Sequence, residues 1–75
     1  MFIVMPSDPT TVKASEYLET LNVKHMVLDI PEELGYKTGA NIGIYLEGTD
    51  TEEIMLKLSA KGFVIMRIFK QFELC

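Results

Sequence analysis

The sequence has one cysteine, one histidine and no tryptophan among its 75 residues. A single cysteine cannot form an internal disulfide bond, on which small secreted domains usually depend. One histidine and one cysteine also provide too few ligands for the usual structural zinc sites. These scarcities exclude a disulfide-stapled secreted scaffold and predict a cytoplasmic protein with no metal site and no other cofactor.

Positive charge is scarce as well, because 7 basic side chains stand against 11 acidic ones and the formal net charge is -4. Binding to nucleic acid and attraction to anionic membranes both depend on clustered lysine and arginine. No apolar run approaches the roughly 18 residues needed to span a bilayer. We therefore expect neither nucleic acid nor a membrane among the partners.

The remaining composition is typical of a folded domain. Apolar residues make up 48% of the sequence and charged residues 24%, which is too apolar for a disordered chain. The length suits one compact domain over residues 1–75. A chain of this size buries only about 60% of its unfolded surface, so association between subunits would add stability.

Apolar periodicity predicts four strands, at residues 2–5, 24–30, 42–47 and 63–72, with a helix after the first and third. Asp8 is the expected N-cap of the first helix, and Asn22 is its expected stop. The second helix is expected to begin in a capping box opened by Thr49 or Asp50 and to end at Lys61-Gly62.

The two halves of the chain resemble each other at a spacing of 40 residues, which brings Leu18 to Leu58 and Asn22 to Gly62. Two β-α-β units of matching length with right-handed connections are typical of one architecture. The predicted fold class is α+β: a ferredoxin-like β-α-β-β-α-β sandwich with a four-stranded antiparallel sheet and two helices on one face.

Two helices on one face leave the other face of the sheet open. Alternation along the strands predicts which side chains point to the helices: Met26, Leu28, Ile42, Ile44, Val64, Met66 and Ile68. The open face is then expected to carry His25, Val27, Asp29, Tyr45, Ile65, Arg67 and Phe69. A contiguous exposed apolar patch on a soluble protein usually marks an interface.

The expected partner at this face is a protein, most simply a second copy in a two-fold homodimer formed through the open face or an edge strand. The alternative is a monomer in which residues 72–75 fold back over the face. Base stacking on Tyr45, as in RNA-binding domains, is disfavoured by the negative charge. The candidate interface residues are His25, Val27, Tyr45, Ile65, Arg67 and Phe69.

The loop over residues 35–41 combines glycines, a lysine, a hydroxyl and an amide, which suit a small anion. It is not a P-loop, because a strand and not a helix follows it. The fold would place it near the Pro6-Ser7-Asp8 turn, where the helix N-terminus adds positive potential. The simpler alternative is a long polar connection. The candidate ligand-binding residues, for an unidentified small molecule, are Ser7, Lys37, Thr38, Gly39 and Asn41.

No constellation for catalysis can be defined. His25 has no second histidine or cysteine near it in the sequence, and neither a Ser-His-Asp order nor a Cys-His pair can be defended as a catalytic arrangement. Cys75 is the last residue and stands close to Glu73, which disfavours its thiolate. We therefore expect that the protein is not an enzyme.

Four segments carry a family resemblance: FIVMPS at residues 2–7, YLETLNV at 17–23, IPEEL at 30–34 and FVIMRIF at 63–69. Over residues 2–71 the chain resembles a family of small proteins described as selenium/sulfur carrier-like. The resemblance implies the ferredoxin-like fold and a site in the loop before the third strand, where the family has a Cys-Gly pair. Here Thr38-Gly39 stands at that pair, or Ala40 or Asn41 if the longer loop shifts the alignment, so the thiol needed for a persulfide is replaced.

The predicted function is that of a non-catalytic cytoplasmic binding or adaptor domain, which acts through its open sheet face or the loop over residues 35–41. One alternative is a sulfur or selenium carrier that uses Cys75 as its thiol. The other is a sensor of a small anion or metabolite, an analogy that rests on the fold alone.

Overall fold

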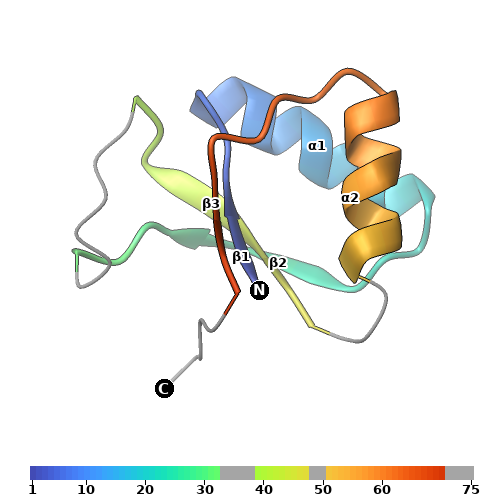
Figure 1. Ribbon diagram of the computed structural model, residues 1–75. Coiled ribbons are helices and arrows are strands. Elements are labelled where there is room, and N and C mark those ends of the chain that lie inside the picture. The colour runs from blue at the N-terminus through green and yellow to red at the C-terminus, as the bar shows by residue number, and fades with distance from the viewer. Residues whose placement is uncertain (33–38, 48–50, 71–75) are drawn as a thin grey trace.

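The computed structural model describes residues 1–32, 39–47 and 51–70, and its elements follow the predicted order (Figure 1). They are β1 (Phe2–Val4), α1 (Asp8–Thr20), β2 (His25–Asp29), β3 (Ile42–Leu46), α2 (Thr51–Ala60) and β4 (Arg67–Phe69). The four strands form one sheet in the order β2-β3-β1-β4, and every neighbouring pair is antiparallel. Each β-α-β unit therefore holds a strand of the other unit between its own two strands, which confirms the predicted α+β, ferredoxin-like class.

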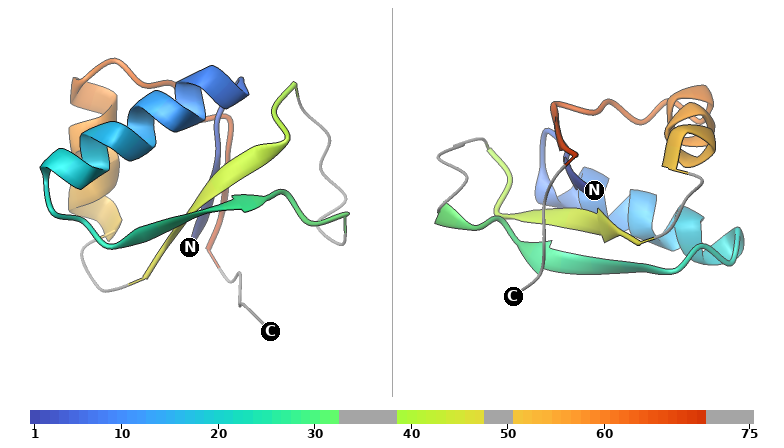
Figure 2. Two further views of the ribbon diagram at one scale, coloured as in Figure 1. Left: turned by 180° about the vertical axis from the view of Figure 1, so that it is seen from behind. Right: turned by 60° about the horizontal axis from the view of Figure 1, so that its bottom comes forward.

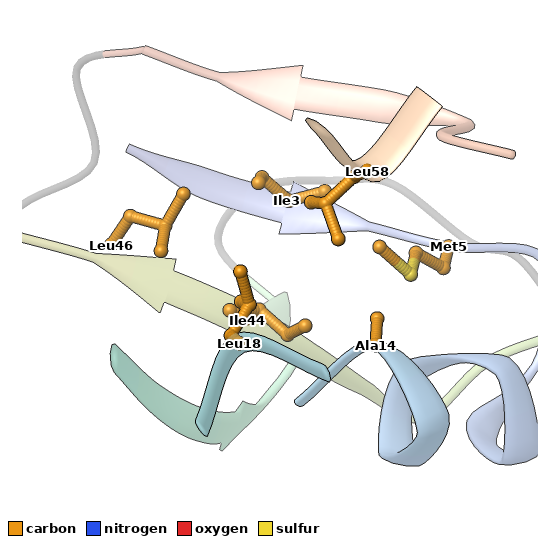
Figure 3. Close-up of a cluster of buried hydrophobic side chains, with 7 residues drawn as sticks. All are labelled: Ile3, Met5, Ala14, Leu18, Ile44, Leu46 and Leu58. Carbon is orange, nitrogen blue, oxygen red and sulfur yellow. The ribbon is translucent and has the colours of Figure 1, made fainter. Parts of the chain in front are cut away.

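Both helices lie on the same side of the sheet, where they enclose the core (Figures 2 and 3). α1 contributes Ala14 and Leu18 to this core, whereas Leu58 is the one buried residue of α2. The sheet is therefore held more firmly to α1 than to α2. The core cluster consists of Ile3, Met5, Ala14, Leu18, Ile44, Leu46 and Leu58.

The two helices end in the same way, at the stops that the sequence predicts. Asn22 and Gly62 have φ angles of 58° and 97°, the left-handed conformation that follows many helices. The Asn22 N–H donates to the Glu19 carbonyl and the Val23 N–H to the Leu18 carbonyl, both at 3.0 Å. Gly62 and Phe63 repeat both bonds, to Ser59 and Leu58, at the same length. Each end is a Schellman motif, so the 40-residue repeat is present in the helices.

The first helix begins one residue earlier than expected. Ser7, not Asp8, is the N-cap, and its Oγ accepts a hydrogen bond from the Thr10 N–H at 3.4 Å. Its carbonyl accepts one from the buried Thr11 Oγ1 at 3.0 Å. The serine takes the capping position and leaves the Asp8 carboxylate for another contact. The capping box expected at Thr49 or Asp50 lies outside the described residues.

The predicted orientation of the second strand was wrong. In the register of β2 with β3, Val27 lies opposite Ile44, and His25 and Asp29 lie opposite Leu46 and Ile42. Residues directly opposite each other share a face, and Ile44 and Leu46 belong to the core. His25, Val27 and Asp29 therefore lie on the helix face, and Met26 and Leu28 lie on the open face. A shift of one residue in a strand turns every side chain over.

The last strand was predicted too long. β4 comprises Arg67–Phe69 and not residues 63–72, of which 71 and 72 lie outside the described residues. The expectation that Ile65 lies on the open face was wrong, because Ile65 packs against the core cluster while Val64 and Met66 are exposed. Residues 63–66 precede the strand, so its alternation does not extend to them. Ile68, opposite Ile3, faces the helices as predicted.

Candidate functional site

The loop before β3 lies beside the turn that precedes α1, as predicted. The Asp8 Oδ1 accepts hydrogen bonds from the Asn41 N–H at 2.7 Å and from the Ile42 N–H at 3.2 Å. The Asn41 side-chain amide donates to Asp8 Oδ2 at 3.2 Å. Gly39 also lies close to the turn, since a Cβ on it would be 3.2 Å from the Pro6 carbonyl oxygen. Lys37 and Thr38 lie outside the described residues.

Asp8 occupies the place that a bound anion was expected to take. Its hydrogen bond from the Asn41 backbone is the main cause of a lowered Asp8 pKa. Desolvation opposes this effect, and the hydrogen bonds from the Ile42 backbone and the Asn41 side chain lower the pKa further. The Ser7 hydroxyl is paired with the Thr10 hydroxyl at 2.9 Å. These donors already have acceptors, so this junction favours a structural role over recruitment of an anion.

The open face is less exposed at its centre than alternation alone suggests. Phe2 and Val4 of the central strand β1 are fully buried, and Tyr45 and Phe69 lie opposite Phe2 on the neighbouring strands. The Phe2 ring covers Gly43 so closely that a Cβ at that glycine would lie 2.5 Å from it. Met26, also on this face, is 46% exposed.

Three of the six predicted interface residues lie on the open face: Tyr45, Arg67 and Phe69. The guanidinium of Arg67 lies 5.2 Å from the Phe69 ring centroid, a cation–π contact. The other three, His25, Val27 and Ile65, do not lie there. Whether any of the six contacts a partner stays a prediction.

His25 makes a contact that the sequence analysis did not anticipate. Its Nδ1 lies 2.8 Å from the Val23 carbonyl oxygen, which can only accept a hydrogen bond, so Nδ1 carries the hydrogen of the neutral ring. Nε2 then accepts a hydrogen bond from the Ser15 hydroxyl at 2.6 Å. A hydroxyl, a histidine and an orienting group are also the parts of a nucleophilic site. Ser15 lies in the middle of α1, however, where backbone N–H groups bond within the helix and cannot stabilise an oxyanion. The pair therefore ties α1 to β2.

A groove lies between α2 and a second wall formed by Met1, which precedes β1, by Ile68 of β4 and by Lys70. We call it the α2 groove, and Figure 1 shows the position of α2 in the fold. The volume of the groove is about 620 Å³, and one stripe of α2 forms one wall while the sheet side forms the other. Leu56, 70% exposed, is on the helix wall. The lining residues are Met1, Thr51, Glu52, Met55, Leu56, Ser59, Ile68 and Lys70.

The α2 groove was missed because its two walls are far apart in the sequence. At helical spacing Ile54, Met55 and Leu58 are enough to form the core-facing side of this helix, and Leu56 then reads as a single exposed leucine. The run Ile54-Met55-Leu56 is wider than one core-facing stripe requires, and this width was the available signal. The position of Ile68 across the groove from α2 follows from the order of the strands in the sheet, and no local sequence pattern predicts it.

Comparisons of the chain with known protein families, with curated proteins and with solved structures find no match. The resemblance to selenium/sulfur carrier-like proteins thus stays a prediction, and Cys75 lies outside the described residues. Among residues 1–32, 39–47 and 51–70, no three His, Cys, Asp or Glu side chains gather closely enough to hold a metal ion. None of the helices described is both long and apolar enough to cross a membrane.

Proposed function

We propose that this chain is a non-catalytic binding domain that takes an apolar ligand into the α2 groove. The observation that carries the proposal is the groove itself, whose volume of about 620 Å³ is within the range of roughly 300–1,000 Å³ typical of small-molecule sites. A cytoplasmic location is part of the proposal and is supported by the low cysteine content.

The lining supports a ligand with an apolar body and a polar end. Met55 and Ile68 supply apolar surface from opposite walls, and methionine adapts its shape to irregular ligands. Glu52 and Lys70 add one charge of each sign. A few polar groups among apolar ones are what orients a ligand in such a site.

Titration with octanoate and 1-octanol tests the proposal, because these probes share one alkyl chain and differ in the head group. We expect the methyl NMR signals of Met55 and Ile68 to shift on addition of either probe. Tighter binding of octanoate would assign the polar end to Lys70. Leu56→Asp is expected to weaken binding at least about tenfold, since it places a carboxylate beside the alkyl chain.

Val64→Asp is the matched control, because Val64 is 59% exposed and is not part of the groove lining. This variant is expected to bind like the unchanged protein. Both variants replace exposed side chains, so both should retain the circular dichroism spectrum of the fold. Unshifted Met55 and Ile68 methyls, or equal binding by Leu56→Asp, would refute the proposal.

A further inference from the structure

The outer edge of the sheet at β2 has features that natural edge strands usually avoid. Edges are commonly protected by short strands, bulges, prolines or charges at their centre. β4, the other edge, has three residues and includes Arg67. β2 has five residues in unbroken register with β3, and its centre is Met26-Val27-Leu28. Met26 and Val27 are 46% and 42% exposed.

Backbone polar groups of β2 also point outward at alternate residues. The Ile30 N–H donates to the Asn41 carbonyl at 2.9 Å, on the β3 side. In an antiparallel ladder every second residue of an edge strand directs its N–H and C=O to the neighbouring strand. Met26 and Leu28 therefore pair with β3, and the backbone groups of His25, Val27 and Asp29 face away from the sheet.

From these observations we propose that the outer edge of β2 pairs with the same edge of a second copy of the chain, antiparallel and centred on Val27. The two four-stranded sheets then form one continuous sheet of eight strands across a two-fold axis. The outward groups of His25, Val27 and Asp29 are the ones that such a ladder uses.

The side chains of β2 are self-complementary in this register. Val27 meets Val27 of the second copy, and His25 lies opposite Asp29 of the second copy, twice by symmetry. On the other face Met26, which is 46% exposed, lies opposite Leu28 of the second copy and is covered by it. Apolar cross-strand pairs stabilise a sheet, whereas like charges directly opposite each other destabilise it, and in this register no two carboxylates face each other.

The match of this strand to itself, with Val27 opposite Val27 and Met26 opposite Leu28, favours a second copy over an unrelated chain. Ser15 and Val23 hold the His25 ring on the helix face, which is also the face of Asp29. Moving the register by two residues in one direction brings Pro31 into the ladder, where it cannot donate a hydrogen bond. Moving it in the other direction leaves Asp29 without His25 opposite it.

Sedimentation equilibrium from micromolar to millimolar concentration tests the association. One copy has a mass of 8.5 kDa, so the dimer is expected at twice 8.5, or 17 kDa. Val27→Lys places two ammonium groups at the two-fold axis and is expected to return the mass to 8.5 kDa. Val12→Lys, at a 48% exposed position of α1, is the control and should remain dimeric.

Disulfide trapping in a Cys75→Ser background tests the register. Directly opposed residues in a hydrogen-bonded pair have Cα atoms about 5.5 Å apart, which suits a disulfide. Val27→Cys is therefore expected to form a covalent dimer under mild oxidation. Asp29→Cys should not, because Asp29 lies opposite His25 and not opposite itself. A mass of 8.5 kDa at millimolar concentration, or equal trapping at both positions, would overturn the proposal.

Discussion

At the scale of single residues, Asp8 has the most consequential contact outside the core. Its carboxylate accepts the Asn41 and Ile42 N–H groups and so joins the first turn of α1 to the start of β3. An asparagine at position 8 would keep one oxygen to accept the backbone N–H groups. Its NH₂ group would face the Asn41 side-chain NH₂, so two donors would meet where Asp8 Oδ2 now accepts. The contact therefore depends on the ionised carboxylate.

This dependence predicts how stability changes with pH. The Asp8 pKa is lowered in the folded protein, mainly by the Asn41 backbone hydrogen bond, so as the pH falls the unfolded state binds the proton first. The contribution of Asp8 is complete above its unfolded pKa of about 3.8, and it is lost as the pH falls through the lower folded pKa. We expect Asp8→Asn to be less stable than the unchanged protein at neutral pH, and the difference to disappear in acid.

Urea denaturation at a series of pH values measures this difference. Glu16→Gln, which removes a carboxylate from the exposed side of the same helix, is the matched control and should follow the unchanged protein at every pH. A stability difference for Asp8→Asn that does not shrink as the pH falls through the acid range would contradict the account.

At the scale of elements, the two helix ends predict the effect of substitutions at Gly62. Its φ of 97° is strained for most residues, and a Cβ there would meet no atom within 4 Å, so only the backbone conformation matters. Gly62→Ala is expected to lower the free energy of unfolding by about 1–2 kcal/mol. Gly62→Asn should cost less, because Asn22 adopts φ 58° at the equivalent position. Chemical denaturation compares the two, and equal losses would argue against a purely conformational cause.

The helices and strands differ in how well the sequence predicts them. Leu18 and Leu58 are 40 residues apart and both are buried, but the equivalent strand residues Ile3 and Ile44 are 41 apart, as are Val27 and Ile68. Helix stops come from local chemistry and were found. Alternation along β2 separates its side chains into two sets but does not determine which set meets the helices. That choice depends on the register with β3, where a difference of one residue turns the strand over.

The candidate sites also divide into features that the sequence predicts and features that depend on how the elements pack. The approach of residues 39–41 to the α1 turn follows from topology. Because Ser7 and not Asp8 is the N-cap, the Asp8 carboxylate is left to accept the Asn41 N–H, and the junction becomes a structural contact instead of an anion site. The tie between Ser15 and His25 needs the correct face of β2. The α2 groove needs the distance between α2 and the sheet, which only packing determines.

At the scale of the whole molecule, the weak anchoring of α2 connects the groove to stability. α1 is fastened to the sheet by buried residues, by the Asp8 junction and by the Ser15–His25 pair. α2 has Leu58 in the core, while Ile54 and Met55 pack against the core only partly buried. Beyond its end, the Phe63 ring centroid and the Lys61 Nζ lie 6.0 and 5.5 Å from the Tyr17 ring centroid. An apolar ligand in the groove would contact both α2 and the sheet and hold them together.

Hydrogen exchange is expected to show this difference in anchoring directly. Amides of α2 should exchange through an opening of lower free energy than those of α1, β1 and β3, because few buried contacts are lost when α2 separates. Leu58→Ala removes a buried leucine, a change that typically costs about 2–5 kcal/mol, and should further lower the protection of α2 most of all. Leu18→Ala, at the equivalent position of α1, should instead lower protection across the whole sheet. If α2 amides are as protected as those of β1 and β3, and Leu58→Ala lowers all of them equally, then α2 is an integral part of the folding unit and the groove is a rigid surface.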